Sequence, residues 1–296
     1  MTSGVSKSGA LLAISAYVLW GLFPLYWKAL DGIPLWEILS HRVIWSSATI
    51  LLVLVSFRRL SGLSAVARNP RQLLVLGVTA LLIGTNWSVY IYAIHRKELL
   101  QASLGYYANP LMSVCLGVVL LREKLNRPQI IAVVFAGIGV LVLGWQHQGI
   151  PWIAIILSLS FAFYGFAKKK VHLDTLSGLA VETLWLAPVA ALYLALKPGP
   201  QAFASEWHHT LLLIGTGAIT LTPLIFFNAA AKKLPLSTLG FFQYLSPSIQ
   251  LLVAVILFHE PFTRTHAAAF ALIWVALGLY SWDAFRRTAP AKMPLR

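Results

Sequence analysis

The chain has 296 residues, of which 58% are hydrophobic and only 11% are charged, and its mean hydropathy is +0.76. Because a water-soluble domain carries charge on about a quarter of its residues, this composition excludes an ordinary soluble enzyme. The net charge of +14 would suggest nucleic-acid binding in a soluble chain, so the positions of the charges decide what the basicity means. The single cysteine, Cys115, excludes an intramolecular disulfide and a cysteine-based metal cluster.

Ten apolar stretches follow one another along the chain, each about 20 residues long and without a polar stripe. Lipid offers no hydrogen-bond partners to the backbone, so such a stretch crosses a membrane as a closed helix. We therefore predict an all-α integral membrane protein with ten transmembrane helices. The expected helices span Ser8–Ala29, Pro34–Phe57, Gln72–Ile94, Gln101–Leu121, Pro128–Trp145, Ile150–Ala167, Thr175–Leu196, Thr210–Ala231, Leu236–Phe258 and His266–Phe285.

The basic residues lie mainly in the loops on one side of this expected bundle. Seventeen of the 23 lysines and arginines fall in the terminal segments and in the loops on the same side, five fall in the opposite loops, and Arg42 lies within the second helix. Cytoplasmic loops of membrane proteins carry such an excess. We therefore predict cytoplasmic N- and C-termini, and we interpret the cluster Lys168-Lys169-Lys170 as a topology signal rather than a lipid or nucleic-acid site.

Two segments resemble each other in the type and order of their residues, and a proline follows each. Ser103-Leu104-Gly105-Tyr106-Tyr107 in the fourth helix matches Thr238-Leu239-Gly240-Phe241-Phe242 in the ninth. Glu123 and Glu260 each lie 13 residues after these prolines, Pro110 and Pro247. Because the copies are five spans apart, an odd number, the second copy enters the membrane from the opposite side. We predict two inverted five-helix repeats, residues 8–145 and 150–286, with the substrate site between them.

Ionisable side chains are costly inside a membrane and mark functional sites by default. Near its start, the second helix carries Glu37, His41 and Arg42. Glu37 and His41 are four residues apart and share a helix face, whereas Arg42 lies about 100° further round. We expect His41 and Arg42 to contact substrate and Glu37 to be a candidate for proton coupling. Alternatively, Glu37 and Arg42 compensate each other and hold the helix against its neighbours.

The seventh helix is the inverted counterpart of the second, and it carries Glu182. Glu182 is the second candidate for proton coupling, and the alternative is a protonated glutamate that is hydrogen-bonded to a neighbouring helix.

Uncharged polar and aromatic side chains complete a possible substrate path, although any one of them alone more often forms an interhelical hydrogen bond. The expected substrate contacts are Trp20, Asn86, Tyr90, Asn109 and Gln243. Glycine and proline recur at equivalent places in the fourth and ninth helices and predict bending there. The expected gating residues are Gly105, Pro110, Gly240 and Pro247.

Sequence motifs of familiar enzymes are absent from the chain. It contains no Walker loop, HExxH, CxxC or GxSxG motif, so neither ATP hydrolysis nor familiar metal or serine chemistry is supported. Most histidines, including His208 and His209, fall in expected loops, and we expect no metal site. We predict a protein that is not an enzyme and needs no cofactor.

Four segments carry a family resemblance: Ala16–Lys28, Glu37–Arg42, Ala102–Tyr107 with Asn109-Pro110, and Leu239–Tyr244. Together they resemble the RarD family of permeases, in the EamA branch of the drug/metabolite transporter superfamily. The resemblance implies two inverted five-helix repeats, a location in the bacterial inner membrane and alternating access without ATP. It also implies that the fifth and tenth helices are peripheral and that helices 2, 3, 4, 7, 8 and 9 surround the site.

The expected function is secondary transport of a small organic solute, a metabolite or a drug, with a proton as the candidate coupling ion. The expected partners are a small-molecule substrate and the lipid bilayer, without nucleic acid, and no feature indicates an oligomeric state. The alternative is a non-transporting membrane sensor or assembly protein that retains the transporter fold. A membrane-embedded enzyme is a third possibility, weakened by the lack of a catalytic constellation.

Overall fold

The computed structural model describes residues 6–286 except for 96–98, 146–150, 171–172, 200, 258 and 260–261. Within these residues the regular structure is helical, and ten stretches are long and apolar enough to cross a membrane, which confirms the predicted fold class. In chain order they are α1 (Lys7–Lys28), α2 (Leu35–Ser56), α4 (Pro70–His95), α5 (Leu99–Leu121), α6 (Arg127–Gly144), α7 (Trp152–Lys170), α8 (Thr175–Leu196), α9 (Trp207–Ala231), a ninth stretch of three segments, and α12 (Arg264–Arg286).

The ninth stretch is interrupted where the sequence predicted one continuous helix over Leu236–Phe258. It consists of α10 (Leu236–Gln243), α11 (Leu245–Leu252) and a π-helical segment, η1 (Val253–Leu257). Pro247 has no N–H to donate to the carbonyl of Gln243, so the regular helical ladder fails where α10 meets α11. In contrast, α5 continues through Pro110 as one helix.

A short helix, α3 (Leu60–Ala67), lies in the loop between α2 and α4. The hydropathy of the chain did not indicate it, because eight residues are too few to form a span. Arg58 adopts a left-handed conformation with φ of 54° directly after α2, so the chain turns before α3 begins. α3 then packs against α8 and α4 at the edge of the bundle.

The helices pack in pairs that repeat between the two halves of the chain. α1 contacts α9 and α11, and α7, its equivalent in the second half, contacts α4 and α5. The contact of α2 with α9 is matched in the same way by the contact of α8 with α4. The same set of contacts is therefore formed twice, as expected for two five-helix halves that run in opposite directions.

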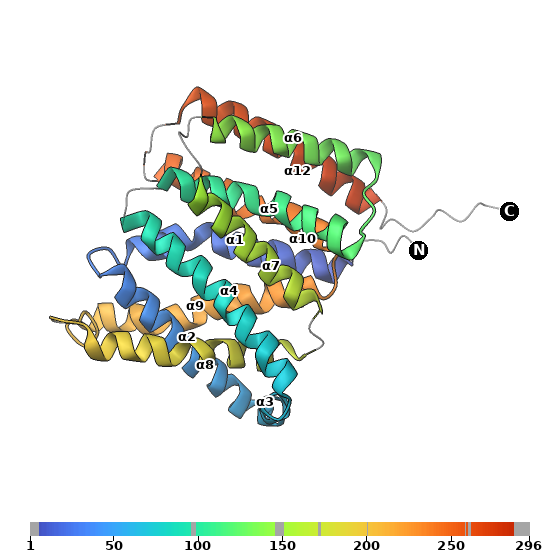
Figure 1. Cartoon of the computed structure of the whole chain (residues 1–296). Helices are drawn as coiled ribbons and strands as arrows, with labels where there is room; N and C mark the ends of the chain where they lie inside the picture. Colours follow the sequence, from blue (N-terminus) through green and yellow to red (C-terminus); the bar gives the residue numbers. More distant parts are fainter. Residues whose placement is uncertain are drawn as a thin grey trace.

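Figure 1 shows α6 and α12 side by side at one edge of the bundle, where they contact each other. These are the fifth and tenth spans, and their peripheral position agrees with the expectation from the family resemblance. α1 begins and α12 ends at the same end of the bundle, which we call the terminal end, and the opposite end is the far end. The central helices α1, α7 and α9 meet in an aromatic cluster of Tyr17, Trp20, Phe161, Tyr164 and Phe227.

Candidate functional site

A cavity lies among α1, α2, α4, α5, α7, α9 and the α10–α11 segment. Its lining residues come from the middle of these helices and from the half nearer the far end, such as Trp27 near the end of α1 and Arg42 near the start of α2. The space open to the centres of water molecules measures about 140 Å³. Aromatic side chains form much of the wall: Tyr17, Trp20, Phe23, Trp27, Trp87, Tyr90, Tyr106 and Phe161.

The helices around this cavity differ in part from those that the family resemblance implied. α8, the seventh span, contributes no residue to the lining, whereas α1 and α7, the first and sixth spans, do. The reason is the packing of α8, which lies against the outer sides of α2 and α4 and is separated from the cavity by them.

Arg42 is the charged residue among the described lining residues. Its Nε atom donates a hydrogen bond of 3.0 Å to the hydroxyl of Thr220 on α9. The guanidinium carbon lies 4.4 Å from the ring centre of Trp87 and 5.0 Å from that of Trp27. Both tryptophans therefore stabilise the cation through their negative ring faces.

Most of the other expected substrate contacts also line the cavity. These lining residues are Trp20, Asn86, Tyr90, Asn109 and Gln243. The expected gating residue Pro247 also lines the cavity. The Asn86 amide already donates to the Leu157 carbonyl at 2.9 Å and to the Ser160 hydroxyl at 3.0 Å, so it joins α4 to α7. The rings of Tyr90 and Tyr106 meet edge to face at 5.4 Å.

Asn109 has no hydrogen-bond partner for either atom of its amide within the described part of the chain. Its side chain is fully buried and lines the cavity from α5. Asn109 lies three residues after Tyr106, so both residues face the cavity from adjacent turns of one helix. Buried amides are normally hydrogen-bonded, so this side chain is an unused donor and acceptor in the cavity wall.

His41, predicted to contact substrate, does not line this cavity. Its ring stacks on Phe203, with ring centres 5.0 Å apart and planes 21° apart. Its two ring nitrogens are buried and have no hydrogen-bond partner among the described residues. The side chain of His41 lies about 100° round the helix from Arg42, and this rotation places it against the segment before α9 rather than in the cavity.

Glu37 is fully buried and does not pair with Arg42, so the expected compensation between these two residues is wrong, whereas the expected hold of α2 against its neighbours by Glu37 is found. Its carboxylate pairs with the Lys197 ammonium at 2.5 Å and accepts a hydrogen bond of 2.6 Å from the backbone N–H of Ala202. These contacts fix the chain between α8 and α9 to the start of α2. Sequence spacing alone did not identify Lys197, because the partner is 160 residues away.

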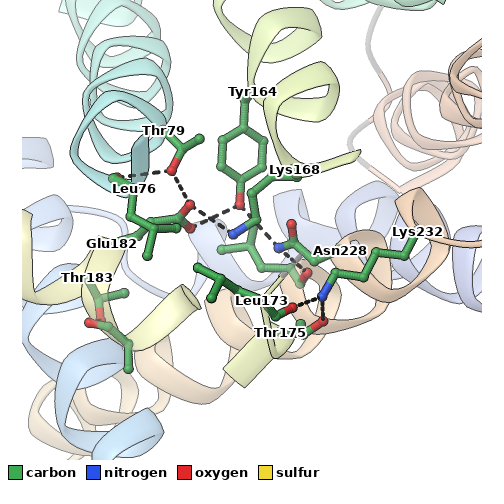
Figure 2. Close-up of polar contacts among 12 residues, drawn as sticks. Leu76, Thr79, Tyr164, Lys168, Leu173, Thr175, Glu182, Thr183, Asn228 and Lys232 are labelled. Carbon is green, nitrogen blue, oxygen red and sulfur yellow. Dashed lines mark hydrogen bonds and ion pairs between the residues drawn. The ribbon is translucent and has the colours of Figure 1, made fainter. Parts of the chain in front are cut away.

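Glu182 lies at the centre of a buried polar network near the terminal end, on the other side of the aromatic cluster from the cavity. Figure 2 shows its carboxylate between Thr79, Tyr164 and Lys168. The Lys168 ammonium pairs with it at 2.9 Å, the Tyr164 hydroxyl lies 3.4 Å away, and the Thr79 hydroxyl also donates to it. Asn228 extends the network by donating to the Tyr164 hydroxyl at 3.2 Å.

The sequence interpretation missed Lys168 as the partner of Glu182. Lys168 belongs to the basic run that we interpret as a topology signal, yet its side chain is buried while Lys170 in the same run is exposed. The difference between these two lysines follows from the rotation of α7 and carries no separate sequence signal. Nearby, Lys232 donates to the Leu173 carbonyl and to Thr175, and burial together with the charge of Lys168 lowers the pKa of Lys232.

Two further contacts close the bundle towards the terminal end. The Tyr17 hydroxyl donates to the carbonyl of Leu239 at 3.1 Å and so joins α1 to α10. The Glu123 carboxylate accepts from the backbone N–H groups of Leu236 and Ser237 at 2.7 and 2.9 Å, so it caps the start of α10. Glu260, its counterpart in the repeat, lies outside the described residues.

The remaining predicted gating residues lie at close helix contacts rather than in the cavity. A Cβ atom on Gly105 would lie 3.0 Å from the Cα atom of Ala154 on α7. A Cβ atom on Gly240 would lie 2.9 Å from the carbonyl oxygen of Pro110 on α5. Glycine thus lets α5 approach both α7 and α10 closely.

Glu206, His208 and His209 form a cluster at the far end, at the start of α9. One ligand atom from each residue lies within 4.8 Å of the others, but Glu206 and His208 are exposed. The Glu206 carboxylate also pairs with the His208 ring at 3.0 Å. This surface contact accounts for the proximity of the three side chains.

Comparison with known proteins gives consistent matches over both halves of the chain. Residues 7–145 and 148–282 each match the EamA-like transporter family. An uncharacterized transporter of Pseudomonas aeruginosa is 42% identical over 97% of both chains. Protein RarD of Escherichia coli is 41% identical over 98% of this chain and 100% of its own.

Two more distant similarities extend this result. The chloramphenicol-sensitive protein RarD of Pseudomonas aeruginosa is 32% identical over 95% of this chain and 96% of its own. A protein of known crystal structure is 20% identical and has a TM-score of 0.75, covering 96% of this chain and 99% of that chain. This last similarity shows a shared fold.

Proposed function

Since this chain belongs to the EamA-like transporter family, a transporter family rather than an enzyme family, we propose that it is a secondary transporter of a small organic solute that works by alternating access. The observation that carries the proposal is the asymmetry of the bundle. A polar and aromatic cavity occupies the half nearer the far end, and interlocking polar contacts occupy the other half. A cavity in one half of the bundle with interlocking contacts in the other half is the arrangement expected for one of the two states of alternating access.

The excess of basic residues at the terminal end supports a cytoplasmic position for that end. In this orientation the cavity faces the periplasm, and the contacts of Glu182 with Lys168 and of Tyr17 with Leu239 close the cytoplasmic side. The two halves of the chain, residues 8–145 and 150–286, would rock about the cavity to reverse this arrangement. The contacts between α8 and α7 and between α1 and α10 would then open.

Bending of α5 and of the α10–α11 segment would accompany this motion. Pro110 and Pro247 each free a carbonyl in the preceding turn, and Gly105 and Gly240 lie at tight contacts with neighbouring helices. The existing interruption after Gln243 supports a hinge in the ninth span. We propose these four residues as the gating residues.

Glu182 is the proposed proton-coupling residue. Protonation of its carboxylate would remove the charge that holds Lys168 and would loosen the closed side of the bundle. Glu37 is a second candidate. Protonation of its carboxylate would likewise weaken its contacts with Lys197 and Ala202, which lie at the far end. If Glu182→Gln and Glu37→Gln each leave the pH dependence of transport unchanged, coupling through these acids is refuted.

Solute flux into proteoliposomes tests transport directly. We expect uptake or release of members of a panel of metabolites and antibiotics, with chloramphenicol included because one relative is named for sensitivity to it. Complete absence of flux across the panel, with and without a pH gradient, would favour a sensor or an assembly protein that retains the fold.

One-sided labelling tests the alternation. The labelled position is Ser246, which lines the cavity. The variant Cys115→Ala provides a background without the native thiol. In this background we expect Ser246→Cys to react with an impermeant maleimide from the periplasmic side. Adding Lys168→Met should give reaction from the cytoplasmic side as well, whereas Lys170→Met should not. Equal reaction patterns in the two lysine variants would contradict closure by Lys168 and Glu182.

A further inference from the structure

We propose that the cavity binds a small aromatic or apolar monocarboxylate, with its carboxylate on Arg42 and a second polar group on Asn109. This inference rests on the proposed function, because it names the substrate class of the same cavity. It begins from the charge of Arg42, for which no described residue supplies a carboxylate partner. Arg42 is partly buried, and a cation withdrawn from bulk water without a counter-charge is costly, so the site is complete only when an anion enters.

The surroundings of Arg42 leave the right donors available. Thr220 accepts from the Nε atom, and the two tryptophan rings lie over the guanidinium group. Neither the hydroxyl nor the rings supply negative charge. The Nη donors have no hydrogen-bond partner among the described residues, and a carboxylate accepts two parallel N–H bonds from such a fork.

The rest of the cavity argues against a substrate with an ammonium group. Among the lining residues that the structure describes there is no aspartate or glutamate, so an amine would find no anionic partner beside the charge of Arg42. A zwitterion would leave its ammonium group unpaired, and a cation would be repelled. The cavity therefore favours a solute that carries one negative charge and no positive charge.

The size and walls of the cavity define the body of that solute. A water molecule takes up about 30 Å³ in the liquid, so the space of about 140 Å³ holds about five water molecules and suits a small solute. Trp20, Trp87 and Phe161 offer flat apolar surfaces, which favour an aromatic ring.

Asn109 supplies the second polar contact. Its buried amide lines the cavity and has no partner for its oxygen or its nitrogen within the described chain. A solute hydroxyl can both donate to this oxygen and accept from this nitrogen. The amide therefore selects a solute with a hydroxyl or amide group away from the carboxylate.

Binding measurements on the full chain in nanodiscs test the charge preference. We would titrate phenylacetate, phenylacetamide and phenethylamine, which share one ring and differ in charge. We expect phenylacetate to bind at least about ten-fold more tightly than the amide, and the amine to bind most weakly. Equal affinities for phenylacetate and phenylacetamide, or no phenylacetate binding at millimolar concentration, would overturn the proposal without any variant.

Variants locate the preference on Arg42. We expect Arg42→Gln to remove the advantage of phenylacetate over phenylacetamide, Arg42→Lys to keep part of it, and the exposed control Arg71→Gln to keep all of it. An unchanged preference in Arg42→Gln would assign the anion to another site and overturn the proposal.

A fourth compound tests Asn109. We expect 4-hydroxyphenylacetate to bind more tightly than phenylacetate to the native chain, and Asn109→Leu to abolish this gain while the carboxylate preference remains. If the hydroxyl brings no gain in the native chain, the assigned role of Asn109 is wrong.

Flux measurements separate this inference from the proposed transport function. Flux of neutral solutes with no preference for carboxylates would leave transport standing and refute the anion site. Binding of phenylacetate that depends on Arg42, without flux of any solute, would leave the anion site standing and refute transport.

Discussion

The ammonium nitrogen of Lys168 lies 2.9 Å from a carboxylate oxygen of Glu182, and the two side chains are only 5% and 3% exposed. Thr79 and Tyr164 donate to the same carboxylate, so the pair joins α4, α7 and α8. A buried ion pair holds together well, but either partner left alone is strongly destabilising. Single substitutions of Lys168 or Glu182 should therefore have large effects on stability.

Removal of the Lys168 ammonium should destabilise the protein by about 3–5 kcal/mol, because it leaves the Glu182 charge buried and unpaired. Lys168→Met is the variant, and unfolding in mixed micelles is the measurement. Lys170→Met is the matched control, since its side chain is exposed in the same helical turn. The double variant Lys168→Met with Glu182→Leu should recover most of the loss. Equal stability of the two single variants would contradict the buried pair.

Gly240→Ala should destabilise the contact between α10 and α5. The added Cβ atom would lie 2.9 Å from the Pro110 carbonyl oxygen, so one helix must move, at a cost of about 1–3 kcal/mol. Gly137→Ala is the control, because nothing lies within 4 Å of its Cβ position. It should be neutral or stabilising by up to about 1 kcal/mol, since alanine favours helix. The same unfolding assay compares the two, and a neutral Gly240→Ala would mean that the contact is looser than described.

Tyr17→Phe should weaken the joint between α1 and α10. It removes the hydroxyl that donates to the Leu239 carbonyl and keeps the aromatic ring in the cavity wall. The expected loss is about 0.5–1.5 kcal/mol of unfolding free energy. Tyr193→Phe serves as the control, because its hydroxyl has no hydrogen bond among the described residues. A smaller loss for Tyr17→Phe than for Tyr193→Phe would exclude this role for the hydroxyl.

Glu123→Ala should destabilise the start of α10 by about 1–2 kcal/mol, because two backbone N–H groups lose their acceptor. Glu206 precedes α9 but makes no capping hydrogen bond with its side chain. Glu206→Ala should therefore change stability by less than about 0.5 kcal/mol. Hydrogen exchange of the first amides of α10 gives a local readout, and unchanged exchange in Glu123→Ala would show that the cap is dispensable.

Much of the fold could be predicted from the sequence because each span depends on the hydropathy of its own residues. Hydropathy over a window of about 20 residues reports whether a helix faces lipid, and all ten spans are found near the expected places. The match between Ser103–Tyr107 and Thr238–Phe242 likewise indicated the repeat that the helix packing displays. The sequence predicted a bend in the ninth span rather than the break after Gln243. A proline removes one backbone hydrogen bond, and the packing of neighbouring helices decides whether the helix continues, as in α5, or is interrupted.

The candidate site was predictable as a set of residue types but not as a set of partners. Arg42 and Asn109 line the cavity, and intramembrane polarity identified both. The same criterion selected His41 and Glu37, which lie outside the cavity. Polarity reports that a side chain needs a partner, whereas helix rotation decides which side it faces.

The sequence by itself determined the membrane location, the number of spans and the internal repeat, because these depend on solvent preference and on short segments. Only the tertiary structure decided that Glu182 pairs with Lys168, that Glu37 pairs with Lys197 and that Arg42 has no acidic partner among the described residues. Arg42 and Thr220, for example, are 178 positions apart and meet only because α2 packs against α9. Contacts between distant helices depend on how each helix is rotated about its axis and on its position along the membrane normal. No local pattern in the chain specifies these two quantities.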